Sequence, residues 1–516
     1  MGPRGWGLCL LLLLPAAYGA AAARGLGGRM EPFGAGLTLL GRRRAVAGVG
    51  AGAIAVVAST RRLRRAVRFQ AGMAAIGGKY ARGFILTRGA SPERQQAELE
   101  RIDEETAHDI LHLVTTMRGA YIKSAQLIST AFPDIIPQPW VAKLETLTDD
   151  APPRPWAETQ KILESELGPR WGESFRTFGE RPIGAASVGQ VHKAVLADGR
   201  SVCVKVMYPG VERQMMADLA NVRRVLRIAK PALLPAVDEF KERVQHEFDY
   251  EAEALKMERV RLYVAKRRLP KVKVPKAVLE LTTQRVMTME WLDGKSLSET
   301  VQRRYNAITQ STWPVLRPLQ LSRLKRSTLL ALRRTAKAQG CMIFGDGAFS
   351  CDPHPGNVLL VGGAVGLIDY GCFATFNDEQ RVNVAKLYVA LAQRDEDAIV
   401  DAMRVIGFRS RKNDKDFIVA FATQCFDRDL SGACMTSPYS LLKKLESQDR
   451  LLTIPKTYML VARVSLLLRG LASKCGSDLS IATVWHAEAQ AVVDEDMRRR
   501  AALKAPAVET TALESV

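Results

Sequence analysis

The sequence predicts an α+β fold in which a small β-rich part lies between two mainly helical regions. Apolar residues recur at helical spacing after residue 91, and pairs of β-type runs are joined by turn dipeptides. The chain has 516 residues, of which 47% are hydrophobic and 25% charged. Those values are typical of a globular protein, with enough length for several domains or for one large two-lobed domain with extensions.

The first 70 residues are basic and poor in acids. They contain 11 Arg, no Lys and a single acid, Glu31, so they carry +10 of the formal net charge of +20. Residues 1–25 have an Arg, a leucine run and then small residues, the layout of a secretory-type signal peptide, and the stretch that follows is typical of an organelle transit peptide. We expect an organellar, membrane-associated protein. A bipartite plastid leader, a mitochondrial leader and a single membrane anchor all stay open.

A second apolar stretch covers residues 45–60. At 16 residues it is shorter than the roughly 20 that a membrane-spanning helix needs. Gly48 and Gly52 give a GxxxG spacing, which permits close helix contact in lipid. A shallow anchor and an unstructured transit segment are equally compatible with it. Nucleic acid is not favoured as a partner, because no zinc finger and no stripe of alternating basic and aromatic residues is present.

Cysteine and histidine usage argues against a structural metal. The eight cysteines are scattered without a CxxC pair, which disfavours both a zinc site and a disulfide framework. His354 lies between two prolines with no second histidine at ligand spacing. Buried free thiols are the simpler interpretation of the cysteines.

The region after the leader is predicted to be helical. Ser91 can cap a helix and Pro92 fits its first turn. Apolar residues then recur at helical spacing from Leu99 to Met117. A proline-rich stretch at 149–155 reads as a connector to the next region.

The β-type runs come next. Residues 187–195 and 201–208 flank Asp198-Gly199, which predicts a hairpin. A long helical region is expected over 211–266, followed by a buried strand within 284–294. A second hairpin is expected around Gly362-Gly363, and the remainder up to residue 500 is mostly helical.

Three polar side chains in an apolar, glycine-rich segment indicate phosphoryl transfer. That chemistry needs oxygen ligands for magnesium, a lysine near the phosphates and a carboxylate to orient the attacking group. Asp352 and Asn357 are five positions apart, like the catalytic Asp and the magnesium-binding Asn of protein kinases. Asp369, followed by Tyr and Gly, then takes the place of the metal-binding Asp-Phe-Gly.

The upstream half of such a nucleotide site is present as well. Residues 184–191 fit the frame G-x-G-x-x-G-x-V, with Ala186 at the second glycine. Lys205 ends the β-type run Val-Cys-Val-Lys, where a phosphate-contacting lysine would pair with a glutamate on a helix. The sequence QHEFDYEAEAL supplies four candidate partners for that lysine, namely Glu247, Asp249, Glu251 and Glu253.

Taken together, these motifs resemble the aarF/UbiB family of atypical kinases, which is associated with ubiquinone and other prenyl lipids. The resemblance covers about 67–500. Its carriers are Lys123-Ser-Ala-Gln126, Pro182-Ile-Gly-Ala-Ala-Ser-Val-Gly-Gln-Val-His192, Val202-Cys-Val-Lys205, Glu247-Phe-Asp249 with Glu253, Asp352-Pro-His-Pro-Gly-Asn357 and Asp369-Tyr-Gly371.

The resemblance implies a role for each matched residue. Asp352 would be the catalytic aspartate, Asn357 and Asp369 the Mg²⁺ ligands, and Glu253 the partner of Lys205. The positions implied to contact ATP or ADP are Gly184, Ala185, Ala186, Ser187, Gly189, Val191, Lys205, Met289 and Glu290. The positions implied to belong to a regulatory extension over the active site are Lys123, Gln126, Glu247 and Asp249.

Three positions depart from the family pattern. Ala125 replaces a signature glycine, Gly184 replaces the first alanine of the loop, and Tyr370 replaces the usual Phe or His. None of them removes a charged group that handles phosphate. Ala125 does bear on how the extension seats, because a methyl group takes up clearance in a close contact.

The resemblance therefore implies an α+β, two-lobed protein-kinase-like fold with an N-terminal helical extension. The expected parts are a targeting segment (1–25), a basic, membrane-associating segment (26–70), the extension (71–150), an N-lobe (151–293), a C-lobe (294–500) and a disordered tail (501–516).

The implied activity is that of an atypical kinase or ATPase acting on a quinone precursor or prenyl lipid. Because the extension of the family covers the groove for a peptide, ordinary protein phosphorylation is not expected. A low-turnover nucleotide-binding regulator or scaffold of a lipid biosynthetic complex is the alternative. A membrane-structural protein that acts through its basic arm is the third reading.

Overall fold

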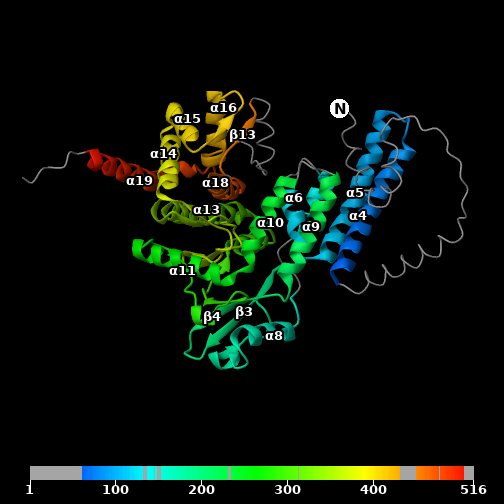
Figure 1. The fold of residues 1–516 in the computed structure, drawn as a ribbon, viewed down its shortest axis with the longest axis horizontal. Coiled ribbons are helices and arrows are strands. Elements are labelled where there is room, and N and C mark those ends of the chain that lie inside the picture. The colour runs from blue at the N-terminus through cyan, green and yellow to red at the C-terminus, as the bar shows by residue number, and fades with distance from the viewer. Residues whose placement is uncertain are drawn as a thin grey trace, which may run out of the picture. The chain divides into compact units, whose positions relative to one another are not determined.

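The computed structural model describes residues 61–131, 136–144, 146–147, 153–186, 188–229, 234–311, 313–429, 449–475 and 477–504. The chain divides into two compact units (Figure 1). The first comprises residues up to 159 with 182–190 and 207–248, and the second comprises 160–181, 191–206 and 249–516. The predicted targeting segment 1–25, residues 26–60 of the predicted basic segment with the apolar stretch 45–60, and the tail beyond residue 504 lie outside the described residues, whereas residues 61–70 are helical.

The first unit is almost entirely helical. The predicted helix after Ser91 is confirmed, since the Ser91 side chain accepts from the Arg94 N–H and the helix runs to Met117. The first described helix runs from Arg61 to Leu86. The elements of this unit are α4 (Arg61–Leu86), α5 (Pro92–Met117), α6 (Ala120–Ala131), α7 (Gln138–Leu144), β2 (Gly184–Ala185), α9 (Val211–Ala229), α10 (Leu234–Gln245) and η4 (His246–Phe248).

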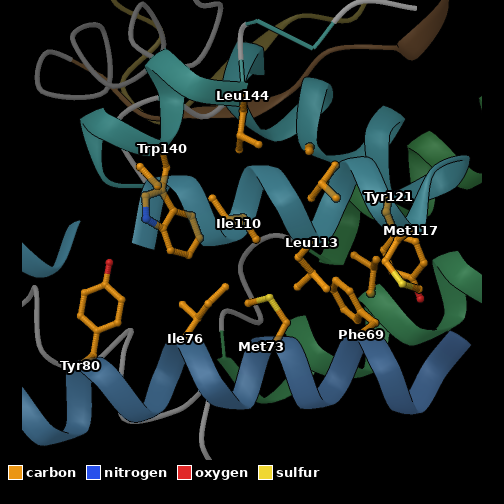
Figure 2. Packing of buried hydrophobic residues seen from close by; sticks show 14 of the residues in the cluster. Phe69, Met73, Ile76, Tyr80, Ile110, Leu113, Met117, Tyr121, Trp140 and Leu144 are labelled. Carbon is orange, nitrogen blue, oxygen red and sulfur yellow. The ribbon is translucent and has the colours of Figure 1, made fainter. Parts of the chain in front are cut away.

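The core of the first unit lies where α4, α5, α6 and α7 meet (Figure 2). Helix α4 packs closely on α5 at two of its glycines. A Cβ on Gly72 would lie 2.7 Å from the Leu113 side chain, and one on Gly83 would lie 2.3 Å from Ile102. Two of the four glycines of α4 thus leave room for the Leu113 and Ile102 side chains of α5 against the α4 backbone.

The second unit holds the strands and the larger set of helices. Its main sheet has the order β1-β3-β4-β6, and a second sheet has the order β5-β10-β9-β7. The strands are β1 (Phe175–Phe178), β3 (Gly189–Leu196), β4 (Ser201–Met207), β5 (Val272–Lys273), β6 (Val286–Glu290), β7 (Lys295–Ser296), β8 (Ala348–Ser350), β9 (Val358–Val361), β10 (Ala364–Leu367), β11 (Phe373–Thr375), β12 (Arg409–Ser410) and β13 (Leu451–Thr453).

Both predicted hairpins and the predicted buried strand are confirmed. The first turn closes with the Leu196 N–H on the Arg200 carbonyl, and Gly199 has φ +89°. The second hairpin pairs β9 with β10 in antiparallel register, with Gly362 and Gly363 at φ +56° and +76°. Positive φ costs glycine nothing, which is why these dipeptides mark the turns.

The helices of the second unit pack around an aromatic core. The Trp485 indole donates to the Ala336 carbonyl at 2.6 Å, and the ring lies 4.8 Å from that of Tyr388. The helices are α8 (Trp156–Leu167, which begins in the first unit), η2 (Trp171–Ser174), α11 (Tyr250–Arg267), η5 (Leu279–Leu281), α12 (Leu297–Thr309), η6 (Pro314–Leu316), α13 (Arg317–Cys341), η7 (Met342–Asp346), α14 (Asp378–Gln393), α15 (Glu396–Val405), α16 (Lys415–Ala422), η8 (Thr423–Asp427), α18 (Lys456–Lys474) and α19 (Ile481–Lys504).

The long helical region expected over 211–266 is confirmed in the described residues. It consists of α9, α10, η4 and α11, and Asp249 caps α11 by accepting from the Ala252 N–H at 2.9 Å. The mixture of helices with antiparallel sheets confirms the predicted α+β class. Among the described residues, no helix combines the length and the apolar character that crossing a membrane would require.

Candidate active site

Lys205 and Glu253 form a buried ion pair in the second unit. Strand β4 presents Lys205, whose ammonium donates to the two Glu253 carboxylate oxygens at 2.8 and 3.0 Å. Glu253 stands in the first turn of α11, and its side chain is only 4% exposed. Of the four acidic candidates, the structure therefore brings Glu253 to the lysine.

Burial and charge act on this pair in opposite ways. Burial lowers the pKa of Lys205, but the negative charges of Glu253 and Asp369 and the Tyr250 side chain outweigh it, so that pKa is raised. Burial raises the pKa of Glu253, Asp369 raises it further, and Lys205 opposes both. Each charge is therefore stable in this interior because the other is present.

Asn357 and Asp369 lie side by side at the base of the β9–β10 hairpin. The Asn357 amide donates to Asp369 Oδ2 at 2.7 Å, and the Gly371 N–H donates to Asp369 Oδ1 at 2.9 Å. The hairpin register sets this contact, because the Ile368 N–H donates to the Asn357 carbonyl directly beyond the last strand pair. Tyr370, which stands between Asp369 and Gly371 in the sequence, is fully buried.

Asp352 follows β8 and pairs with a distant arginine. Strands β8 and β11 are antiparallel, and the Cys351 N–H donates to the Cys372 carbonyl at 2.9 Å. This pairing brings the segment before Asp352 next to the segment after Gly371. Arg463 on α18 donates through Nη2 to Asp352 Oδ2 at 3.1 Å.

Asn357 and Asp369 are suited to hold a magnesium ion. The Asn357 side chain contacts Asp369 through its amide nitrogen, so its amide oxygen is not used in that contact. One carboxylate and one amide oxygen are hard ligands of the kind that Mg²⁺ takes together with phosphate oxygens. Within the described residues, no group of three or more His, Cys, Asp or Glu could hold a metal ion by itself. His354 accordingly has no such companions.

The loop expected to cover the phosphates belongs to the first unit. Gly184 and Ala185 form β2, the Ala186 N–H donates to the Gly189 carbonyl at 2.8 Å, and Ser187 lies outside the described residues. A Cβ on Gly184 would meet nothing within 4 Å, so the alanine that the family has there would fit without strain.

The residues expected near adenine lie on the main sheet of the second unit. Val191 is half-buried on β3, and Met289 on β6 is 5% exposed. The N–H groups of Glu290 and Trp291 donate to the carbonyls of Lys276 and Ser201 at 2.8 and 3.0 Å. Because both N–H groups already have acceptors, a main-chain donor to adenine would come from a residue after Trp291 in the chain.

The extension residues in the first unit form their own contact. Lys123 on α6 donates to the Glu247 carboxylate and forms an ion pair with it. Asp249 instead caps α11 in the second unit. Gln126 lies on α6, with its side chain outside the described residues. Ala125 is 7% exposed within the core of the unit, so its methyl group is packed.

Two residues of this site were not predicted from the sequence. Arg463 contacts Asp352 from 111 residues further along the chain, where no local spacing could reveal it. Tyr250 places its ring 5.0 Å from the Lys205 ammonium, a cation–π contact. An aromatic residue three positions before the paired glutamate is the signal that could have found it.

Comparisons with known proteins agree on one family. Residues 146–403, half of the chain, match the family model of the ABC1 atypical kinase-like domain. AarF domain-containing protein kinase 1 of Gallus gallus is 28% identical over 71% of this chain and 70% of its own length. The chloroplastic Arabidopsis thaliana protein named ACTIVITY OF BC1 COMPLEX KINASE 3 is 28% identical over 76% of this chain.

The chain spans little more than half the length of several of these relatives. It covers 53% of the Arabidopsis protein and 56% of the AarF domain-containing protein kinase 1 of Mus musculus, which is 31% identical over 58% of this chain. Among solved structures, the Mycobacterium tuberculosis protein Rv3197, in complex with erythromycin, aligns with a TM-score of 0.46 at 24% identity. That alignment covers 76% of this chain and 97% of Rv3197.

Proposed function

This chain belongs to the ABC1 atypical kinase-like family, the aarF/UbiB-type atypical kinases, and on that premise we propose that it binds magnesium–ATP and transfers or hydrolyses the terminal phosphate. The observation that supports this most is the grouping in one unit of the Lys205–Glu253 pair with the Asn357–Asp369 pair. A lysine held by a glutamate and a metal-binding aspartate are the two arrangements that kinase activity requires together.

Each residue has a proposed task. Lys205, oriented by Glu253, contacts the phosphates and balances their charge. Asn357 and Asp369 would hold Mg²⁺, which supplies charge neutralisation at the phosphate oxygens when bound. Asp352 accepts the proton of the attacking hydroxyl group or water, and Arg463 fixes the direction of its carboxylate.

The proposed acceptor is a small molecule of a lipid pathway, or water, rather than a peptide. This part of the proposal rests on the family resemblance, in which the extension covers the peptide groove. The proposed setting is an organelle membrane, supported by the basic leader and by the chloroplastic relative. A low-turnover nucleotide-binding scaffold remains the second candidate, because the same contacts would also hold a nucleotide without turnover.

Single-turnover assays with γ-labelled ATP test the proposal. We expect release or transfer of labelled phosphate by the wild type, stimulated by phenolic or prenyl-lipid additives. Asp352→Asn should reduce it by about a hundredfold or more while leaving ATP binding intact. A wild-type rate equal to that of Asp352→Asn, with tight ATP binding in both, would favour the scaffold.

A further inference from the structure

The positive charge outside the leader is concentrated on one helical hairpin. Residues 300–345 contain seven Arg and two Lys but no Asp or Glu, a net +9. The leader, residues 1–70, carries +10 of the total +20, so this segment accounts for almost all of the rest. It covers most of α12, η6 and α13, and the two helices pack against each other in the second unit.

The connection between the two helices exposes a run of large apolar side chains. Trp313, Val315, Leu316 and Leu319, which we call the apolar tip, are 69%, 87%, 46% and 52% exposed. Single exposed apolar residues are ordinary on a soluble protein, but four within seven positions form a patch of the kind that marks a binding surface.

Behind the apolar tip lies a belt of cations. The exposed side chains of Arg303 and Arg304 on α12 and of Arg323, Lys325 and Arg326 on α13 form this basic belt. In the described part of the chain none of the five makes an ion pair. Lys295 and Lys337, toward the far ends of the hairpin, are instead paired with Glu299 and Glu488.

The spacing between tip and belt is that of a bilayer interface. Arg323 comes six residues after the start of α13 and Arg304 five before the end of α12, so they lie about 9 and about 7.5 Å along their helices from the ends that meet the connection, at the helical rise of 1.5 Å per residue. Interfacial protein segments bury their apolar part about 5–10 Å deep while basic side chains stay at the phosphates. Tryptophan is enriched at the same level.

We propose that this hairpin docks the protein on an anionic lipid bilayer, with the apolar tip inserted and the basic belt at the phosphate level. The charge argues for this occupant over the chain's own leader, because the leader is equally positive and would be repelled. The inference goes beyond the nucleotide chemistry and does not depend on it.

Hydrogen exchange of the full-length protein locates the contact. Vesicles of phosphatidylcholine mixed with phosphatidylglycerol should slow exchange in peptides that cover 305–326, and vesicles of phosphatidylcholine alone should not. This readout separates the hairpin from the basic leader, which could bind the same vesicles. Protection confined to residues 1–70, or no protection of the hairpin, overturns the proposal; an acidic protein as the true occupant would give that result.

Vesicle flotation of variants supplies the second test. Arg323→Glu with Arg326→Glu should weaken partitioning onto the mixed vesicles by at least about tenfold, at roughly 1 kcal/mol for each basic residue. Trp313→Ser with Val315→Ser should weaken it as well. The control is Arg176→Glu with Arg411→Glu, two exposed arginines outside the hairpin, for which we expect a smaller change. Equal losses in the control and belt variants, all with wild-type melting temperatures, would contradict a specific surface.

Discussion

Arg463 holds the carboxylate of Asp352 at 3.1 Å, although α18 and the segment after β8 are 111 residues apart in the chain. Both side chains are about one third exposed. The Arg463 Nε is buried and has no hydrogen-bond partner among the described residues. A buried donor without a partner is costly, so this arginine has a binding capacity that its contact with Asp352 does not use.

Because Arg463 holds the carboxylate of Asp352, replacing Arg463 should affect turnover more than nucleotide binding. We expect Arg463→Gln to lower kcat for ATP turnover by about tenfold, because Asp352 loses the group that orients it. Arg463→Lys should recover part of the loss, since a cation remains. Steady-state kinetics beside calorimetric ATP affinity would check this. A variant with lower ATP affinity and an unchanged kcat would assign Arg463 to ground-state binding.

Removing Lys205 should weaken ATP binding and destabilise the fold. Lys205→Ala leaves the Glu253 carboxylate buried without its cation, which we expect to cost about 3 kcal/mol in urea unfolding. Lys266→Ala on the same helix α11 as Glu253 is the control, since Lys266 is exposed, and should change stability by less than about 0.5 kcal/mol.

The loss of folding stability in Lys205→Ala should also depend on pH. Burial already raises the pKa of Glu253, and removing the opposing lysine raises it further. The folded variant then binds a proton that the unfolded chain releases above its ordinary pKa of 4.5. Stability of the variant relative to wild type should therefore be worse at pH 8 than at pH 5. If the stability difference between the variant and the wild type is the same at pH 5 and pH 8, Glu253 stays charged in the folded variant.

The Lys123–Glu247 pair should tune nucleotide handling through the extension. Lys123→Glu or Glu247→Lys alone places like charges together and should shift ATP affinity or hydrolysis by about threefold or more. The double exchange should restore values close to wild type. Additive effects in the double variant would show that the pair is not the acting unit. Unchanged ATP affinity and ATP hydrolysis in all three variants would contradict a regulatory role of the extension.

Local signals predicted the two hairpins, the buried strand β6 and the helix start at Ser91. The turns at Asp198-Gly199 and Gly362-Gly363 contain glycines with positive φ, a conformation that glycine adopts easily. Both hairpins could therefore be predicted from the sequence. The helical region expected over 211–266 is present, but its division into α9, α10, η4 and α11 was not predicted. The helix cap at Asp249 could not be recognised in the sequence, because this residue resembles the other acids of its cluster.

In the candidate site too, some contacts could be predicted from the sequence and others could not. Asn357 and Asp369 are brought together by a hairpin, so their spacing in the sequence encodes their contact. Glu253 could not be chosen among four neighbouring acids by charge pattern alone, because helix phase and burial decide it. Arg463 depends on how α18 packs in the second unit, which no short segment specifies.

The central claim is that Lys205, Asn357 and Asp369 grip one magnesium-chelated nucleotide. Its most direct test is the ATP-induced rise in melting temperature, measured with and without Mg²⁺, for wild type, Asp369→Asn and Asn357→Ala. We predict a rise in the wild type that Mg²⁺ increases, and a rise in both variants that Mg²⁺ no longer changes. The same magnesium-dependent rise in Asp369→Asn as in the wild type would contradict the account.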